Sequence, residues 1–433
     1  MRYRLKADYT MVPILSHPIP NGVITIRDNI IEDVSTFEPS PNNKLRPASE
    51  AISETPYDLK VGEVEIIDLG KAVLMPGFVN SHTHLELSIL KGRLKYRGSF
   101  AHWLEDLVKA KSEWNEKDYV TSTKQGIAEL INTGTTTVAD ITNTGYSVES
   151  IANSGLRGIV YKEVIGLDPE KSENIFKENV EFIESLPQHP LIRYGLSPHA
   201  SYSVSGKLLE KIAIYSANYG TPITIHISES EEEIQFLKEG SSPLREFLKR
   251  IGALPRNWQP IGTTSISYLY GLNFLSSNIL GVHLNFLSDE DIGILNRINM
   301  PIVHCPKSTR YFGRHKSIMD VFPEQFNIAI GTDSLASNDS LNMLDEMRLL
   351  KEALNIPADT ILKMATINGA KALGLEERIG TLQKGKCADI IALRKVKDPA
   401  SLPAQKELTE SLLKDTWEVF LTIVDGKILK YSH

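Results

Sequence analysis

Short apolar runs alternate with amphipathic segments through the middle of the chain, from residue 76 to residue 376. Eight of these runs have the length and the β-branched content of buried strands. They are residues 77–82, 135–141, 156–164, 191–197, 222–228, 278–284, 301–306 and 326–333. Because segments with helical spacing lie between the runs, the pattern predicts eight βα units around a parallel sheet. The α/β architecture that this count favours is a (β/α)8 TIM barrel.

The helical segments between these runs have readable ends. Ser205 stands before a periodic segment that stops at Gly220, as expected for a serine N-cap and a glycine just beyond the last turn. Ser288 and Asp291 have the spacing of a capping box. One longer excursion, residues 241–277, separates the fifth strand from the sixth. The predicted barrel therefore carries one insertion at this point.

The two ends of the chain have β character instead. Residues 1–75 contain alternating runs such as GVITIRD and lack a convincing amphipathic helix. Residues 377–433 return to strands with EVFLTIVDGKILK. We predict that both ends form one small composite β-sandwich domain beside the barrel of residues 76–376. The alternative is an independent C-terminal module, for which about 55 residues would provide only a marginal core.

Composition places the 433-residue chain among ordinary globular proteins, with 41% hydrophobic and 23% charged residues. A net charge of -7 argues against a broad nucleic-acid-binding face. Cys305 and Cys387 are the two cysteines, too few for a disulfide framework or a cysteine-rich zinc site. No run reaches the ~20 apolar residues of a membrane span, and the N-terminus lacks a continuous apolar signal region. We expect a cytoplasmic protein without nucleic-acid or membrane partners; its oligomeric state stays open, a homodimer included.

Histidines and a carboxylate stand at the C-terminal ends of four predicted strands. His82 and His84 are one residue apart, so both side chains leave the first strand on the same face. His226 ends the fifth strand, His283 the sixth and Asp333 the eighth. Each histidine alone would more often be structural, but TIM barrels place their active sites at this rim. The set suits one Zn²⁺ with a position left open for water; Fe²⁺ or another divalent ion is chemically compatible.

Glu229 follows His226 by three residues, past the end of the fifth strand. A carboxylate at this place can take a proton from the attacking water and pass it to a substrate nitrogen. The alternative is that Glu229 only begins the acidic run ESEEEI at a helix N-terminus. The spacing from a metal ligand favours the catalytic interpretation.

Five motifs in order along the chain resemble those of the amidohydrolase superfamily. They are PGFVNSHTHLE, HISE, GVH, HCPKS and GTDS. The branch that they resemble most contains the mononuclear adenosine and S-adenosylhomocysteine deaminases and the chlorohydrolases. Binuclear relatives add a lysine on the fourth strand, which here ends LSPHASYS, so the resemblance implies one metal ion. The segment IGTLQKGKCADIIAL is similar to the one with which this superfamily completes a composite β domain, which favours that arrangement here.

The resemblance also implies roles for individual residues. The metal ligands would be His82, His84, His226 and Asp333. Glu229 would shuttle the proton, His283 would hold or polarise the reacting group, and Asp333 would also accept the water proton.

The stretch HTHLELSILKGRLKYRGSFAHWLEDL is most similar to the aminodeoxyfutalosine deaminases of menaquinone biosynthesis. His199 matches the histidine of the family's PHAPYS motif, which implies contact with the purine or ribose, and Ser201 replaces the proline of that motif. Trp103 is the candidate for the pocket wall. Each also has a structural interpretation, as a satisfied rim histidine or a core aromatic. The ribose-binding glutamate of related deaminases has no clean counterpart, and Glu86 is the substitute candidate.

The futalosine-type substrate also carries a carboxylate, for which the loops after the first and seventh strands offer five cations. These are Lys95, Arg97, Lys307, Arg310 and Arg314. We expect most of them to be solvated and select Arg310 as the candidate ligand.

These features predict a metal-dependent deaminase acting on the 6-amino group of an adenine nucleoside, with 6-amino-6-deoxyfutalosine as the preferred substrate. The alternatives keep the same machinery: deamination of S-adenosylhomocysteine, methylthioadenosine or adenosine, deamination of guanine, or chlorohydrolysis of a triazine. A non-catalytic barrel would lack metal ligands, and none is missing here.

Overall fold

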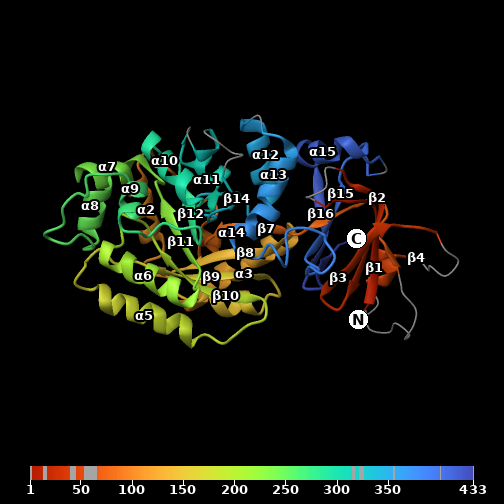
Figure 1. Ribbon diagram of the computed structural model, residues 1–433, viewed down its shortest axis with the longest axis horizontal. Helices are drawn as coiled ribbons and strands as arrows, with labels where there is room; N and C mark the ends of the chain where they lie inside the picture. The colour runs from red at the N-terminus through yellow and green to blue at the C-terminus, as the bar shows by residue number, and fades with distance from the viewer. Residues whose placement is uncertain are drawn as a thin grey trace.

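The computed structural model describes residues 2–12, 17–39, 45–52, 66–314, 317–320, 326–354, 356–399 and 401–432. A barrel of strands and helices forms one part of the molecule, and a smaller β domain that contains both chain ends forms the other (Figure 1). The red N-terminal strands lie among the blue C-terminal strands, so the two ends of the chain share one domain.

Eight parallel strands form the barrel in chain order. They are β7 (Phe78–Thr83), β8 (Thr135–Thr142), β9 (Arg157–Val164), β10 (Ile192–Pro198), β11 (Ile223–Ile227), β12 (Ile279–His283), β13 (Ile302–His304) and β14 (Ile328–Ile330). The first and last strands meet where the backbone N–H groups of Thr332 and Asp333 both donate to the carbonyl of His82 at 3.1 Å. Each strand overlaps a predicted apolar run, so the (β/α)8 barrel is confirmed.

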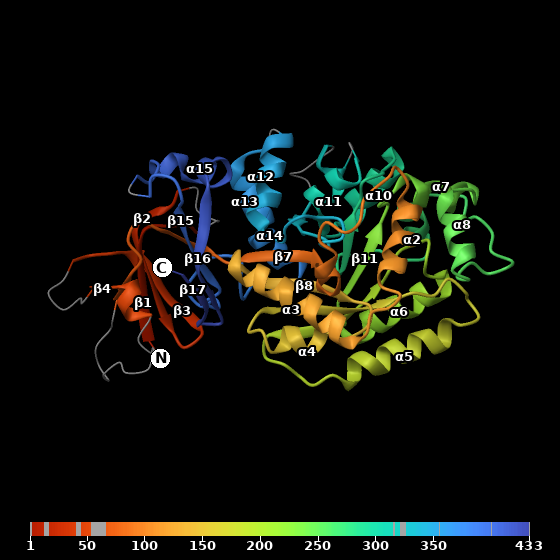
Figure 2. The same ribbon diagram turned by 180° about the vertical axis from the view of Figure 1, so that it is seen from behind.

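Helices lie around the outside of the barrel strands (Figure 2). They are α2 (Phe100–Ala110), α3 (Glu116–Asn132), α4 (Ser147–Ala152), α5 (Ser172–Ser185), α6 (Gly206–Tyr219), α7 (Glu231–Glu239), α8 (Pro243–Arg250), α9 (Ser265–Gly271), α10 (Asp289–Ile298), α11 (Pro306–Tyr311), α12 (Met343–Ala353), α13 (Ala358–Met364) and α14 (Ile367–Ala372). Short 3-10 turns η1 (Leu85–Leu90) and η2 (Ile318–Asp320) follow β7 and α11. The predicted insertion holds α8 and α9.

The predicted helix ends are confirmed. The side chain of Ser205 accepts a hydrogen bond from the backbone of Leu208, and Gly220 ends α6 with a φ of 66°. Ser288 and Asp291 form a complete capping box at the start of α10. Local sequence therefore sets the lengths of these helices, and the apolar face of each one packs on the strands.

The β domain contains strands from both chain ends in one sheet of nine strands. These are β1 (Arg2–Thr10), β2 (Ile19–Arg27), β3 (Ile30–Thr36), β4 (Leu45–Pro47), β5 (Ile66–Asp68), β6 (Val73–Pro76), β15 (Ile390–Lys395), β16 (Trp417–Val424) and β17 (Lys427–Tyr431). Short helices α1 (Ala48–Ala51), η3 (Gln405–Glu407) and α15 (Leu408–Lys414) accompany them. Because β15 pairs antiparallel with β6, the composite domain is confirmed and an independent C-terminal module is wrong.

A buried arginine ties the barrel to the β domain. Arg157, the first residue of β9, is 1% exposed and donates two hydrogen bonds to Asp389, at 2.8 and 3.1 Å. A third bond, of 2.8 Å, reaches Asp425 in the turn between β16 and β17. Removing one partner of such a pair leaves a buried charge without its counter-charge, which costs more than the loss of a surface pair.

We therefore expect Asp389→Asn to lower the free energy of unfolding by about 3 kcal/mol. Urea denaturation followed by circular dichroism measures this change. Glu105→Gln is the matched control, because Glu105 pairs with Arg250 on the surface at 2.9 Å and both side chains are nearly half exposed; about 1 kcal/mol or less is expected there. Equal stability of the two variants would show that the buried pair does not hold the domains together.

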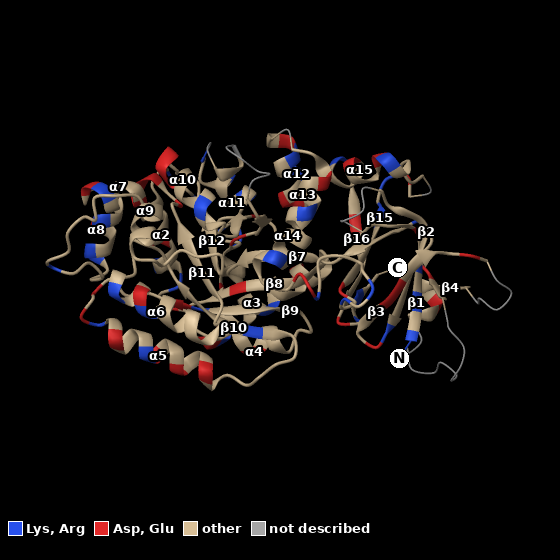
Figure 3. Ribbon diagram, in the orientation of Figure 1, with Lys and Arg blue, Asp and Glu red and all other residues tan. Residues whose placement is uncertain are grey.

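Acidic and basic residues are mixed along the outer helices, as α5 shows (Figure 3). Among the described residues, none of the helices has the length and apolar character that crossing a bilayer would require.

Candidate active site

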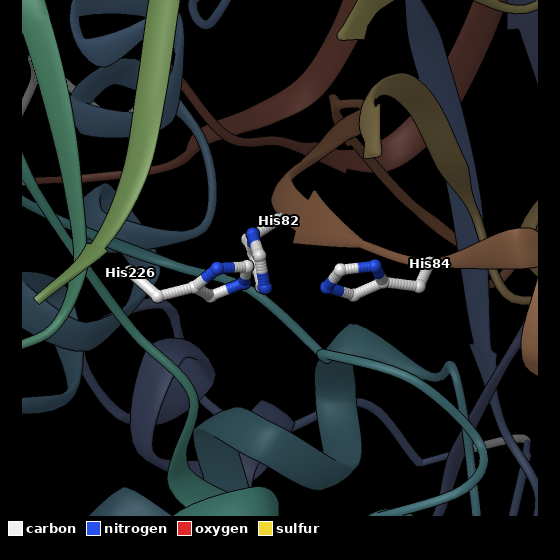
Figure 4. Close-up of side chains that lie close together, drawn as sticks. All are labelled: His82, His84 and His226. Atoms are coloured by element: carbon white, nitrogen blue, oxygen red, sulfur yellow. The ribbon is translucent and has the colours of Figure 1, made fainter. Parts of the chain in front are cut away.

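The imidazoles of His82, His84 and His226 converge at the C-terminal mouth of the barrel. His82 lies in β7, His84 follows it directly, and His226 lies in β11. Their candidate ligand nitrogens all lie within 4.8 Å of one another, and Figure 4 shows the three rings gathered around one place. The ring centroid of His82 is 5.0 Å from that of His84 and 5.1 Å from that of His226. Three imidazoles this close can ligate one divalent ion such as Zn²⁺.

Surrounding hydrogen bonds decide which nitrogen faces this cluster. The Nδ1–H of His226 donates to the backbone carbonyl of His199 at 2.7 Å, which leaves Nε2 for a metal. The Nε2 of His82 is buried and has no hydrogen-bond partner among the described residues. Burial, followed by the charges of the neighbouring histidines, holds the pKa of His82 well below its ordinary value. Neutral imidazole is the form that binds metal, so the donor set fits a single divalent ion.

Asp333 approaches the cluster from beyond the end of β14. Its Oδ1 lies 3.8 Å from the Nε2 of His82 and 3.9 Å from the Nε2 of His84. The hydroxyls of Ser308 and Ser337 donate to Oδ2 at 2.7 and 3.0 Å, so the carboxylate is held with Oδ1 toward the histidines. A φ of 56° places Asp333 in the left-handed region, where a non-glycine residue costs about 1–3 kcal/mol. Such strain is typical of functional positions.

Gly331 lets the Asp333 segment pass close to β7. A Cβ at this position would lie 2.8 Å from the Cβ of His82, nearer than non-bonded carbon atoms approach. The glycine therefore permits the two backbone hydrogen bonds that hold Asp333 beside His82.

Glu229 lines the same cavity as the histidine cluster and is 7% exposed. Ser230 is the N-cap of α7, so Glu229 stands outside the helix that the acidic run begins. Its Oε2 lies 3.9 Å from the Nε2 of His283, and its Oε1 lies 3.3 Å from the guanidinium of Arg314. Its backbone N–H donates at 2.8 Å to the carboxylate of Glu233, which also accepts a hydrogen bond from the backbone N–H of Ser228. The backbone is thus fixed while the carboxylate faces the cavity.

A cavity of about 610 Å³ leads from the cluster to the surface. Its inner wall contains the histidines, Glu229 and Asp333, and its outer wall is largely apolar, with Leu104, Leu107, Val108, Phe247, Leu248, Ile251 and Leu254. Val108, Ile165 and Ile251 are each 47% exposed at the rim. A volume of this size accommodates a small organic molecule, and the exposed apolar rim favours one with an apolar outer end.

Sequence reasoning missed Glu163, which the structure places at the end of β9 in the cavity wall. Its Oε2 accepts a hydrogen bond of 2.8 Å from the amide of Asn143. Burial works to raise its pKa, but the charges of His199, His84 and His226 outweigh burial and lower the pKa to about 2. The position at the end of the third barrel strand was the available signal.

His199 lies in the cavity wall as predicted. Its Nδ1 is 2.7 Å from the hydroxyl of Ser203, which orients the ring. Burial lowers the pKa of His199 to about 4, although Glu163 opposes this effect. The imidazole is therefore neutral near pH 7 and can accept or donate one hydrogen bond to a ligand.

Glu86 lines the cavity, yet its carboxylate is engaged by the protein. The hydroxyls of Thr142 and Thr144 donate to Oε1 at 2.5 and 2.6 Å, and the backbone N–H groups of Asn143 and Thr144 donate to Oε2 at 3.1 and 3.2 Å. The side chain is 3% exposed. Glu86 thus holds the loop after β8, and its contact with substrate remains a prediction.

The two remaining candidates differ in position. Trp103 is both core and wall: it lines the cavity and packs edge-on to Phe312 with ring centroids 4.9 Å apart. Arg310 is exposed and borders a separate cavity of about 310 Å³, so its role as a substrate ligand remains a prediction. Of the five predicted loop cations, Arg314 approaches Glu229, whereas Lys307 and Arg97 pair with Asp339 and Asp106.

The sequence model of the amidohydrolase family matches residues 73–429, which cover the barrel and most of the C-terminal strands. The chain belongs to this family. The amidohydrolase is 31% identical over 391 residues to a 5-methylthioadenosine/S-adenosylhomocysteine deaminase from Carboxydothermus hydrogenoformans, covering 86% of this chain and 84% of the relative.

Solved structures share the fold of this amidohydrolase. An aminofutalosine deaminase from Helicobacter pylori, in complex with methylthio-coformycin, superposes with a TM-score of 0.81 at 22% identity, covering 98% of this chain and 99% of that one. An adenosine deaminase from Xanthomonas campestris with bound zinc gives a TM-score of 0.78 at 21% identity, covering 98% and 92%. Family membership and the histidine cluster together identify the chain as a metal-dependent hydrolase with deaminase relatives.

Proposed function

We propose that this amidohydrolase removes the 6-amino group of an adenine nucleoside with an apolar 5′ extension, and that 6-amino-6-deoxyfutalosine is its preferred substrate. The observation that carries the proposal is one cavity that contains a metal-binding histidine cluster, a fixed carboxylate and an apolar outer wall. The relatives that are named deaminases of adenine nucleosides support the reaction class.

The residues of the inner wall divide the chemistry among them. A divalent ion held by the histidines would supply a water that is acidic enough to lose a proton near neutral pH. Glu229 accepts that proton and delivers it to N1 of the purine as the water oxygen bonds to C6. His283 and Asp333 hold the attacking water and the reacting ring in place. Asp333 then takes the second proton of that water and passes it to the amino nitrogen, which leaves as ammonia when its bond to C6 breaks. Because every group is fixed before substrate binds, little reorganisation is needed.

The outer wall of the cavity would contact the group at the 5′ end of the substrate. Lys111 lines the cavity beside Leu107 and Val108, and no carboxylate of the described residues lies within ion-pair distance of its ammonium group. An aromatic carboxylate attached to the ribose would place its ring on the apolar wall and its charge near Lys111. This arrangement supports a futalosine-type substrate, and Lys111 would then take the role that was predicted for Arg310, which borders a separate cavity.

A second candidate is deamination of S-adenosylhomocysteine or 5-methylthioadenosine. Asp168 and Lys171 also line the cavity, with the Nζ of Lys171 3.9 Å from a carboxylate oxygen of Asp168. The two charges could receive the amino and carboxylate groups of a homocysteine tail. The substrate of the 31% identical relative favours this candidate equally.

A panel of substrates tests these proposals. The zinc-loaded protein is expected to deaminate 6-amino-6-deoxyfutalosine with a kcat/KM at least ~10-fold above that of S-adenosylhomocysteine, 5-methylthioadenosine or adenosine, since a well-placed charge pair is worth about 1.4 kcal/mol or more. Ultraviolet absorbance follows the loss of the adenine chromophore. A higher value for S-adenosylhomocysteine would establish the second candidate, and preference for guanine or a chlorotriazine would overturn both.

A cytoplasmic location and the absence of nucleic-acid and membrane partners remain predictions from the sequence, and the oligomeric state stays open.

A further inference from the structure

Besides Glu229, Asp333 and Asp168, which already have proposed roles, the cavity wall contains two carboxylates, Glu86 and Glu163. A substrate hydroxyl needs an acceptor that is not already saturated. A carboxylate offers about four acceptor positions. Glu86 already accepts four hydrogen bonds, from the last residue of β8 and from the loop that follows it, so its acceptor positions are all occupied.

The carboxylate of Glu163, in contrast, accepts few hydrogen bonds from the protein. Its Oε2 accepts one hydrogen bond, from Asn143, and no described residue donates to its Oε1. Glu86 binds the backbone of Asn143, so it orients the residue that in turn orients Glu163. The result is a fixed carboxylate with one oxygen open to the cavity.

The position of Glu163 relative to the metal cluster indicates which part of a nucleoside it meets. The backbone N–H of His199 donates to the carbonyl of Val164 at 3.0 Å, so His199 and Glu163 stand side by side at the ends of β10 and β9. His199 in turn adjoins the ligand His226, with ring centroids 5.1 Å apart. Two residues beyond Glu163, Ile165 reaches the exposed rim. Glu163 therefore lies between the reaction centre and the mouth.

In a 6-aminopurine nucleoside, C6 and the ribose-bearing N9 lie on opposite sides of the ring system. With C6 at the histidine cluster, the sugar lies toward the mouth of the cavity and beside Glu163. We propose that Glu163, supported by His199, accepts the hydrogen bonds of the ribose 2′- and 3′-hydroxyls and makes the enzyme selective for nucleosides with an intact diol. This inference rests on the proposed deaminase function and identifies the residue that recognises the ribose.

The test compares adenosine with 2′,3′-dideoxyadenosine in the zinc-loaded wild-type protein and in Glu163→Gln. The wild-type protein is expected to prefer adenosine by about 100-fold in kcat/KM, because a hydrogen bond to a charged acceptor is worth roughly a tenfold change or more. Glu163→Gln should reduce this ratio to about 10 or less, while kcat/KM for the dideoxy compound stays within about 3-fold of wild type.

Two further variants keep the test interpretable. Glu163→Asp retains the negative charge on a side chain that is one methylene shorter. This variant should also lose most of the preference for adenosine over the dideoxy compound. Glu86→Gln is the matched control at the saturated carboxylate. It is expected to keep the wild-type ratio even if both rates fall, since its effect passes through the loop.

Each outcome has one meaning. A Glu163→Gln protein that keeps the wild-type ratio, or in which both substrates slow equally, overturns the diol contact. Equal kcat/KM for both nucleosides in wild type leaves the deaminase function standing and overturns the diol contact alone. A wild-type protein that deaminates no adenine nucleoside overturns the proposed function and, with it, this inference.

Discussion

Glu229→Gln is expected to bind its metal normally and to lose turnover by about 10²–10⁴-fold in kcat. Glutamine has nearly the same size as glutamate, so the substitution leaves no cavity. Its carbonyl oxygen can still accept a hydrogen bond from Arg314, which lies 3.3 Å from the carboxylate of Glu229. It removes the basic group that accepts a proton beside His283. Steady-state kinetics with the preferred nucleoside measures kcat, and metal analysis of the purified protein gives the ion content per chain.

Glu231→Gln provides the comparison for this variant. Glu231 lies in the exposed first turn of α7, two residues along the chain, and undergoes the same chemical change. Near wild-type activity is expected, with the loss of one favourable charge near the helix N-terminus costing at most about 1 kcal/mol of stability. If Glu229→Gln turned over as fast as Glu231→Gln, the proton transfer would have to be assigned to another group.

The barrel could be predicted because its determinants are local. Each buried strand is a short apolar run, and each helix end that we named has a side chain that satisfies a free backbone group, as Ser205 and Ser288 do. The composite β domain is a non-local feature, since β6 and β15 are separated by the whole barrel. Alternating apolar runs showed that both ends have β character, and the marginal core of a separate C-terminal module already favoured their pairing. The family resemblance strengthened that prediction.

The candidate metal ligands could also be predicted, because strand ends of a barrel meet at one rim whatever the loops do. The positions of side chains farther into the loops, such as those of Arg314 and Glu86, could not. Arg310 and Arg314 are one helical turn apart in sequence, but α11 ends at Tyr311, so Arg314 leaves the helix and turns toward Glu229. Glu86 sits in the 3-10 turn after β7, which directs its carboxylate to the next loop. No periodicity in the sequence encodes either turn.

Removal of the metal should have the other large effect. Treatment with a chelator is expected to abolish deamination, and added Zn²⁺ should restore it, because the ion is what makes the water acidic enough to lose a proton near neutral pH. His84→Ala should lower the bound metal below one ion per chain and reduce kcat/KM by at least ~10³-fold, since several kcal/mol of transition-state stabilisation depend on the ion. Elemental analysis and kinetics at matched zinc concentrations measure both quantities.

His102→Ala separates loss of a ligand from loss of any histidine. His102 is exposed on α2, and its side chain has no hydrogen bond to the described residues, so this variant should retain metal and activity. The His84→Ala protein should also lose the stabilisation by zinc that wild type shows in thermal unfolding, because an ion that binds only the folded state raises the melting temperature. Full activity of the chelated protein, or of His84→Ala without bound metal, would mean that the three histidines hold a structural site and that water is activated elsewhere.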